Sequence, residues 1–122
     1  MLPKTKMVRR AIESLYDGEC TIVEHKPFTD MNRKTSFRDV ILYEKEPCRL
    51  SFQSLDTTQK NNGAAEIKQI IKLFIAPDIN IPAGCKITVT QNDVTADYKS
   101  SGEPARYETH QEIMLEPFER WS

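Results

Sequence analysis

The chain has 122 residues, of which 39% are hydrophobic, and this size and composition favour one folded domain with its own core. Its 17 basic and 18 acidic residues leave a formal net charge of −1, which argues against a sequence-independent grip on nucleic acid. No apolar run approaches the ~20 residues that a membrane-spanning helix needs. These totals leave a small globular protein whose function must come from local patterns.

The N-terminal residues have the spacing of an amphipathic helix. Met7, Val8, Ala11, Ile12 and Leu15 follow one another at helical intervals and form one apolar stripe, which we expect to pack on the rest of the protein. We therefore assign a helix to residues 1–18, ahead of a single β-domain over residues 19–122. Four basic residues lie off the stripe, on a face that is either solvated or a candidate partner contact: Lys4, Lys6, Arg9 and Arg10.

Most of the remaining chain alternates apolar and polar residues with the period of a strand. Strands are predicted over residues 19–26, 37–44 and 48–53, with a polar loop over 27–36 and an interruption at Pro47. Two further strands, over 85–90 and 94–98, are joined by a short polar connection. A last strand is predicted to place five residues on one face: Tyr107, Thr109, Gln111, Ile113 and Leu115.

Residues 64–76 fit two patterns. Ile67, Ile70, Ile71 and Phe74 have helical spacing, whereas Ile71, Leu73 and Ile75 have strand spacing. The density of β-forming residues favours a largely buried strand, which would bring the count to six or seven. Such a sheet can curl closed and remove its edges. We expect its core to contain Ile71, Leu73, Ile75, Ile87, Val89, Ile113 and Leu115.

The longest polar stretch without a period covers residues 54–64. It is predicted to be a loop, and a loop of this length is either functional or a plain connection. Its residues are Ser54, Leu55, Asp56, Thr57, Thr58, Gln59, Lys60, Asn61, Asn62, Gly63 and Ala64.

The sequence contains no recognisable catalytic, cofactor-binding or metal-binding signature. Its four glycines form no phosphate-binding loop, and no Gly-x-Ser-x-Gly elbow is present. His25 and His110 lie on separate predicted strands, and a solvated sheet face is the simpler interpretation of Glu108, His110 and Glu112. Three cysteines, Cys20, Cys48 and Cys85, are expected to be reduced, buried thiols that hold no metal. We therefore expect no enzyme and no cofactor.

Several segments resemble the head-closure proteins of tailed bacteriophages of Gram-positive hosts, also called stoppers or head–tail connectors. The likeness is carried by residues 71–92, 98–105 and 110–116, and more loosely by residues 11–22 and 47–52. The individual pieces are short, and their order and spacing make the match specific.

The resemblance implies a mainly β fold, a small SH3-like or OB-like β-barrel of about six to seven strands with a short N-terminal helix. It also implies a virion protein at the head–tail interface, made in the host cytoplasm. Its implied partners are portal or adaptor rings, tail proteins, other copies of itself in a 12-fold or 6-fold ring, and transiently the packaged double-stranded DNA, with no membrane. We expect residues 54–64 to face the channel of such a ring.

Two other functions remain compatible with the sequence. One is a tail-completion or tail-terminator protein of the same neck. The other is a monomeric β-barrel binding module for a peptide or nucleic acid. Oligomeric state and neighbouring genes would distinguish them.

Overall fold

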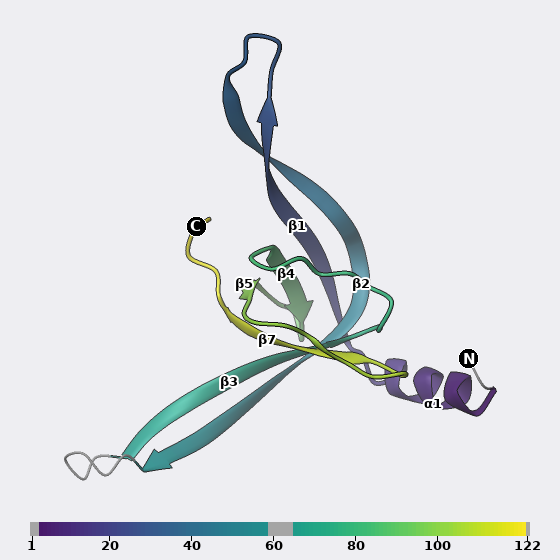
Figure 1. The fold of residues 1–122 in the computed structure, drawn as a ribbon. Coiled ribbons are helices and arrows are strands. Elements are labelled where there is room, and N and C mark those ends of the chain that lie inside the picture. Colours follow the sequence, from purple (N-terminus) through teal and green to yellow (C-terminus); the bar gives the residue numbers. More distant parts are fainter. Residues whose placement is uncertain (1–2, 59–64, 122) are drawn as a thin grey trace.

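The computed structural model describes the backbone of residues 3–58 and 65–121, with side chains for residues 4–54 and 69–121. It contains one short helix and seven strands (Figure 1). In chain order these are α1 (Pro3–Glu13), β1 (Gly18–Thr29), β2 (Thr35–Thr58), β3 (Ala65–Ile75), β4 (Lys86–Gln91), β5 (Val94–Ser100), β6 (Ala105–Arg106) and β7 (Gln111–Pro117).

The seven strands form one antiparallel sheet that closes on itself. The strand order is β3-β2-β1-β4-β5-β7-β6, and β3 also pairs with β7 over residues 71–75 and 111–115. Six strands therefore make a ring, and the two-residue strand β6 is appended to β7. The mainly β fold with a short N-terminal helix is confirmed, as is the assignment of residues 64–76 to a strand rather than a helix.

The core fills the interior of this ring. All seven residues predicted for it are buried. The same buried cluster also contains residues outside the predicted core set, namely Ile22, Leu50, Ile79, Ile81 and Tyr98. Strand alternation directs these side chains inward, because successive residues on a strand point to opposite faces.

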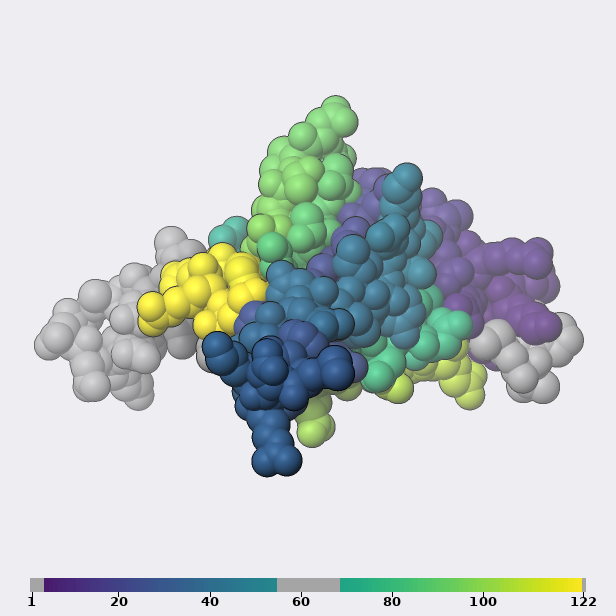
Figure 2. Space-filling model, turned by 90° about the horizontal axis from the view of Figure 1, so that it is seen from above, coloured from purple at the N-terminus to yellow at the C-terminus, as the bar shows by residue number. Residues whose placement is uncertain are grey.

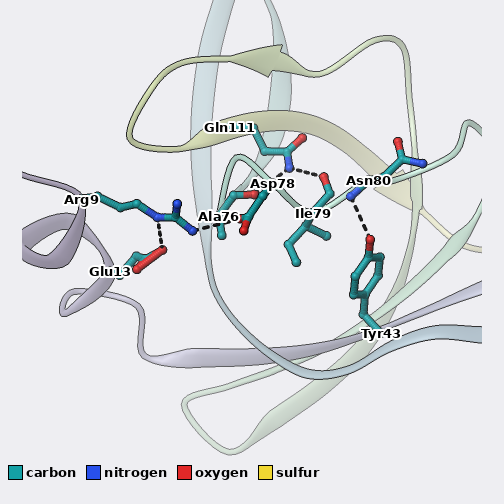
Figure 3. A network of polar contacts seen from close by, with 8 residues as sticks. All are labelled: Arg9, Glu13, Tyr43, Ala76, Asp78, Ile79, Asn80 and Gln111. Atoms are coloured by element: carbon teal, nitrogen blue, oxygen red, sulfur yellow. Dashed lines mark hydrogen bonds and ion pairs between the residues drawn. The ribbon is translucent and has the colours of Figure 1, made fainter. Parts of the chain in front are cut away.

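One end of the ring is capped by the segment between β3 and β4, through buried Ile79 and Ile81. The Gln111 side-chain amide lies beneath this segment and donates hydrogen bonds to the carbonyls of Ala76, at 2.7 Å, and Ile79, at 2.6 Å (Figure 3). The backbone N–H of Asn80 donates to the Tyr43 hydroxyl oxygen, at 3.2 Å. Hydrogen bonds from β7 and β2 thus hold a segment that has no strand partner of its own.

The structure corrects the predicted interruption at Pro47. Residues 35–58 form one strand, and Pro47 pairs within it opposite Glu19. The pairing with β1 shifts between Cys20 and Ile22, beside Lys45, whose φ is 51°. This irregularity is a β-bulge, which bends the strand and lets it continue past the proline.

The predicted loop over residues 27–36 was also too long, because β1 reaches Thr29 and β2 begins at Thr35. The last strand, in contrast, is shorter than predicted. Residues 107–110 form a turn in which the Tyr107 N–H donates to the His110 carbonyl, at 2.8 Å. Gln111, Ile113 and Leu115 are buried as expected, whereas Tyr107 is exposed. Across residues 3–58 and 65–121, no helix is both long and apolar enough to cross a membrane.

Candidate assembly surfaces

Two β-hairpins extend beyond the closed ring as arms (Figure 1). The β1–β2 arm comprises residues 24–39, because the pairing of β1 with β4 ends at Val23. The β2–β3 arm comprises residues 53–58 and 65–70, because the pairing of β3 with β7 ends at Ile71. At about 3.3 Å per residue, each six-residue paired stretch projects about 20 Å from the body. Both arms are two-stranded beyond the ring.

A tight turn at the tip of the β1–β2 arm displays Met31. The Asp30 carboxylate accepts hydrogen bonds from the backbone N–H groups of Asn32 and Lys34, both at 2.9 Å. The Asp30 negative charge is thereby engaged with the turn's own backbone. Met31 is fully exposed at the apex, with Arg33 and Lys34 exposed beside it. In the view from above, this blue arm points towards the viewer (Figure 2). The tip therefore presents an apolar side chain flanked by positive charge.

The C-terminal segment supports this arm near its base. The His25 ring is stacked on both Phe37, at 4.8 Å, and Trp121, at 4.7 Å, between ring centroids. His25 Nδ1 also lies 2.9 Å from an oxygen of Asp39, on the facing strand. Because Trp121 lies far along the chain from His25, this stacking ties the arm to the C-terminal segment.

Replacement of Trp121 by alanine should therefore loosen the arm without unfolding the ring. We expect backbone amide exchange over residues 24–39 to become about two- to tenfold faster, the range that an aromatic stacking contact supplies. Hydrogen–deuterium exchange read by mass spectrometry measures this directly. Tyr107→Ala, which removes a stacked ring from the distant turn beside His110, is the matched control. Unchanged exchange in the arm of the Trp121 variant would show that the stacking supports nothing.

The structure partly corrects the predicted loop over residues 54–64. Residues 54–58 belong to β2 and pair with residues 65–69 of β3, so they form an arm instead of an irregular loop. Residues 59–64 lie outside the described residues. The error arose because the stretch lacks an apolar period, and the strand pairing of a two-stranded hairpin does not require one. The role of residues 54–64 in a channel stays a prediction.

Helix α1 does not pack its apolar stripe on the sheet, contrary to the sequence-based expectation. Met7 is 72% exposed, Val8 47% and Leu15 62%, and Ile12 alone of the stripe is partly covered. Towards its C-terminal end the helix borders a hollow of about 290 Å³ against the outer face of β2 and β3, lined by Ile12, Leu15, Tyr16, Arg49, Ser51 and Phe74. Burial raises the pKa of Tyr16 to about 12, so its hydroxyl stays protonated at neutral pH. The stripe is thus an uncovered apolar surface.

Arg9 connects α1 to the body of the protein through an ion pair. Its Nε lies 3.0 Å from Glu13 and its terminal nitrogen 2.9 Å from Asp78, in the segment that caps the ring (Figure 3). These contacts raise its pKa, chiefly through the Glu13 hydrogen bond, so its charge is fixed. Of the four basic residues predicted as one partner face, Arg9 therefore faces inward, and Lys4, Lys6 and Arg10 are exposed.

The end of the ring opposite the cap is open. A hollow of about 210 Å³ enters the core there, which we call the mouth, and it is lined by Leu50, Phe52, Val89, Gln91, Asn92, Val94, Ala96 and Tyr98. Phe52 and Val94 are exposed at its lip. The Gln91 side chain accepts a hydrogen bond from the Leu50 N–H, at 2.8 Å, and so occupies part of the opening. The mouth lies at the base of the β2–β3 arm.

The cysteine thiols offer no reactive site. Cys20, Cys48 and Cys85 are free and buried, as predicted. The neighbouring Cys48 thiol and burial raise the pKa of Cys20, and burial raises that of Cys85, so both favour the unreactive protonated form. Within the described residues, no three His, Cys, Asp or Glu side chains converge as metal ligands.

His110 belongs to a local network of polar contacts. Its Nε2 lies 3.0 Å from a Glu112 oxygen, and the other Glu112 oxygen lies 3.6 Å from Lys72 Nζ. Glu108 is exposed on the turn. Because Lys72 is on β3 and Glu112 on β7, these contacts join the two strands that close the ring.

Sequence reasoning missed the β1–β2 arm, the mouth and the Trp121 contact. A lone methionine in a polar turn and the single tryptophan near the C-terminus were the available signals. Neither signal says what the side chain touches.

Comparison with known proteins gives a structural similarity and no match in sequence. No protein-family model and no curated protein sequence matches the chain. Among solved structures it is similar to XkdH, a protein of the phage-like element PBSX from Bacillus subtilis, with 11% identity and a TM-score of 0.49. The superposition covers 81% of this chain and 91% of XkdH. A similarity at this level of identity does not assign a function, so the function is inferred from the surfaces of the molecule.

Proposed function

We propose that the chain is a structural protein of a bacteriophage neck, of the head-completion or stopper class. In that role it extends the channel of the portal and adaptor rings, helps to retain the packaged genome and offers the tail a docking surface. The resemblance of residues 71–92, 98–105 and 110–116 to such proteins supports this, and so does the lack of a reactive thiol among the described side chains.

The observation that carries the proposal is a small closed body from which two hairpin arms and a helix project, with apolar side chains exposed on the β1–β2 arm and on α1. Both arms lie beyond the strands that could support them, and isolated two-stranded hairpins are marginally stable in water. Phe37 and Met31 on one arm, Ile41 next to its base, and Met7 and Leu15 on α1 are exposed. Apolar side chains gathered on a projecting element make a suitable contact surface for another protein. These projections therefore favour a subunit of an assembly over a monomeric binding module.

The β2–β3 arm is the element we assign to the channel. Residues 53–70 contain two acidic and two basic residues, so the segment is electrically neutral overall. A strongly basic arm would bind the phosphates and slow ejection, and a strongly acidic one would repel them throughout. Neutral arms repeated around a ring would narrow the channel sterically without binding DNA tightly. Such a closure can hold the genome and still let it pass during ejection.

Particle assembly in the absence of the protein tests this function. We expect heads that package DNA and then lose it, and that carry no tails, with infectivity restored when the wild-type chain is supplied. Electron microscopy counts full heads and attached tails, and nuclease treatment measures how much genome remains protected.

The same experiment separates the other functions. Full heads that retain DNA beside tails of irregular length would assign the chain to tail completion instead. Normal infectious particles, with the chain missing from purified virions, would assign it to a binding role outside the neck. Either result would overturn the proposal.

A further inference from the structure

The tip of the β1–β2 arm and the mouth of the ring have complementary surfaces. We propose that, in the assembled ring, Met31 of one copy inserts into the mouth of a neighbouring copy. This inference rests on the proposed function, since it requires several copies in one assembly. The contact between copies consists of an apolar side chain inside an apolar hollow, with charges of opposite sign around the two.

The tip of the arm is locally basic. Its turn, residues 30–34, contains two basic residues and one acidic residue, a net charge of +1, although the chain as a whole carries −1. The Asp30 carboxylate is bound to the turn's own backbone, whereas no ion pair to Arg33 or Lys34 is present among the described side chains. Arg33 and Lys34 therefore give the tip free positive charge beside Met31.

The mouth has acidic residues at its rim. Asp93 lies in the turn between Asn92 and Val94, which both line the hollow. Asp17 and Glu19 are exposed at the same end of the sheet, because Glu19 pairs with Thr90, three residues before Asp93. Among the described side chains, Arg49 is a nearby basic residue, and it lines the hollow beside α1 rather than the mouth. A basic tip approaching this rim meets charge of the opposite sign.

Tip and mouth lie at opposite ends of the same strands. The β1–β4 pairing runs from Glu19 opposite Thr90, at the mouth, to Val23 opposite Lys86, where the arm begins. The arm then projects about 20 Å further, at ~3.3 Å per residue. One copy cannot bring its own tip to its own mouth. The contact is therefore head-to-tail between copies, the kind that closes into a ring when the rotation between subunits permits.

Size favours the tip over α1 as the occupant. A hollow of about 210 Å³ has room for one or two side chains, whereas a helix with its side chains is about 10 Å across. Met31 at the apex itself offers phosphate neither charge nor a hydrogen bond, whereas an apolar hollow can accept its side chain. The narrow hairpin turn brings one apolar side chain to the opening without displacing the core.

Cysteine cross-linking in assembled particles tests the contact. Asn32 on the tip and Thr95 beside the mouth are both exposed, and the three native cysteines are buried. Particles built with the Asn32→Cys, Thr95→Cys chain and treated with a short bismaleimide should give a ladder of linked copies on a denaturing gel. Asn32→Cys with Glu103→Cys, which is exposed on another turn, should give none.

Further substitutions identify the occupant. Adding Met31→Glu should abolish the ladder, whereas Met7→Glu on α1 should leave it intact. Arg33→Glu should lower the cross-linked yield about fivefold, as expected for one ion pair at a rim, and Asp93→Arg should restore it. Loss of the ladder with Met7→Glu, and its survival with Met31→Glu, would assign the mouth to the helix and overturn the inference.

Other outcomes also overturn it and are distinct from failure of the proposed function. Particles that contain the chain in normal number but give no ladder would refute the contact and leave the neck function standing. If the thiol introduced by Asn32→Cys reacts with maleimide in emptied particles, and is protected only in full ones, the tip meets DNA instead. Wild-type particles that lack the chain altogether would refute the proposed function.

Discussion

Replacement of Leu73 by alanine should lower the free energy of unfolding by about 2–5 kcal/mol. Leu73 lies on β3 and has no exposed surface, and its strand is paired on one side with β2 and on the other with β7. The substitution removes buried apolar surface and leaves a cavity at the point where the ring closes. Because the free energy of unfolding of a small domain is only about 5–15 kcal/mol, this loss is a large fraction of it. Chemical denaturation followed by fluorescence or circular dichroism measures it.

The matched control is Leu15→Ala on α1, which removes the same atoms from an exposed position. Leu15 is 62% exposed, so its truncation should change the stability by no more than about 0.5 kcal/mol. Equal effects of the two substitutions would mean that β3 does not lie in the core and that the ring is not closed through it.

Alternation of side chains predicted the core because burial on one face leaves a period of two in the sequence. Ile87 and Val89 on β4, and Ile113 and Leu115 on β7, were placed correctly on this basis alone. Periodicity alone left residues 64–76 open between helix and strand, and the density of β-forming residues favoured the strand that the structure shows over Ala65–Ile75. Where a strand has one buried face, its sequence carries the information that positions it.

The arms could not be predicted in this way, because each is a two-stranded hairpin beyond the ring, where strand pairing does not need a buried face. Residues 27–29 and 54–58 have no apolar period, and yet they are strand, held by hairpin pairing to the partner strand. Whether a hairpin is covered by a third strand is decided by the topology of the ring. The mouth was missed for the same reason, since it exists where the strands happen to end.

For helix α1, the sequence predicted a buried face that the structure leaves exposed. Its apolar stripe has the period of a packed helix, and the stripe was expected to lie on the sheet. The ion pair from Arg9 to Asp78 connects α1 to the capping segment by a different face, and Met7 and Leu15 remain exposed. An amphipathic pattern states that a face is apolar and does not state which molecule covers it. In this protein the pattern is consistent with a surface kept for a partner.

Shortening the β2–β3 arm should release packaged DNA from heads without unfolding the protein. The change replaces residues 57–66 by Asn-Gly, so that a two-residue turn joins Asp56 to Ile67, which are already paired. The ring is unaffected because the contact of β3 with β7 begins at Ile71, beyond the deletion. Two strand pairs and the segment between them are lost, which withdraws the end of the arm by about 7 Å at ~3.3 Å per residue. Thermal melting of the purified variant should stay close to that of the wild type.

Particles built with this variant should retain it at the neck and yet lose most of their genome before tails attach, as measured by nuclease protection. The control keeps the length of the arm and replaces residues 59–64 by glycine and serine. If the arm closes the channel by bulk, this control retains the DNA and the shortened arm does not. Loss of DNA from both would assign retention to particular side chains. Retention of DNA by both would show that the β2–β3 arm does not close the channel.

Because a neutral arm neither binds nor repels phosphate strongly, the amount of DNA released should depend little on salt concentration, whereas an ionic closure would weaken steeply as salt is raised.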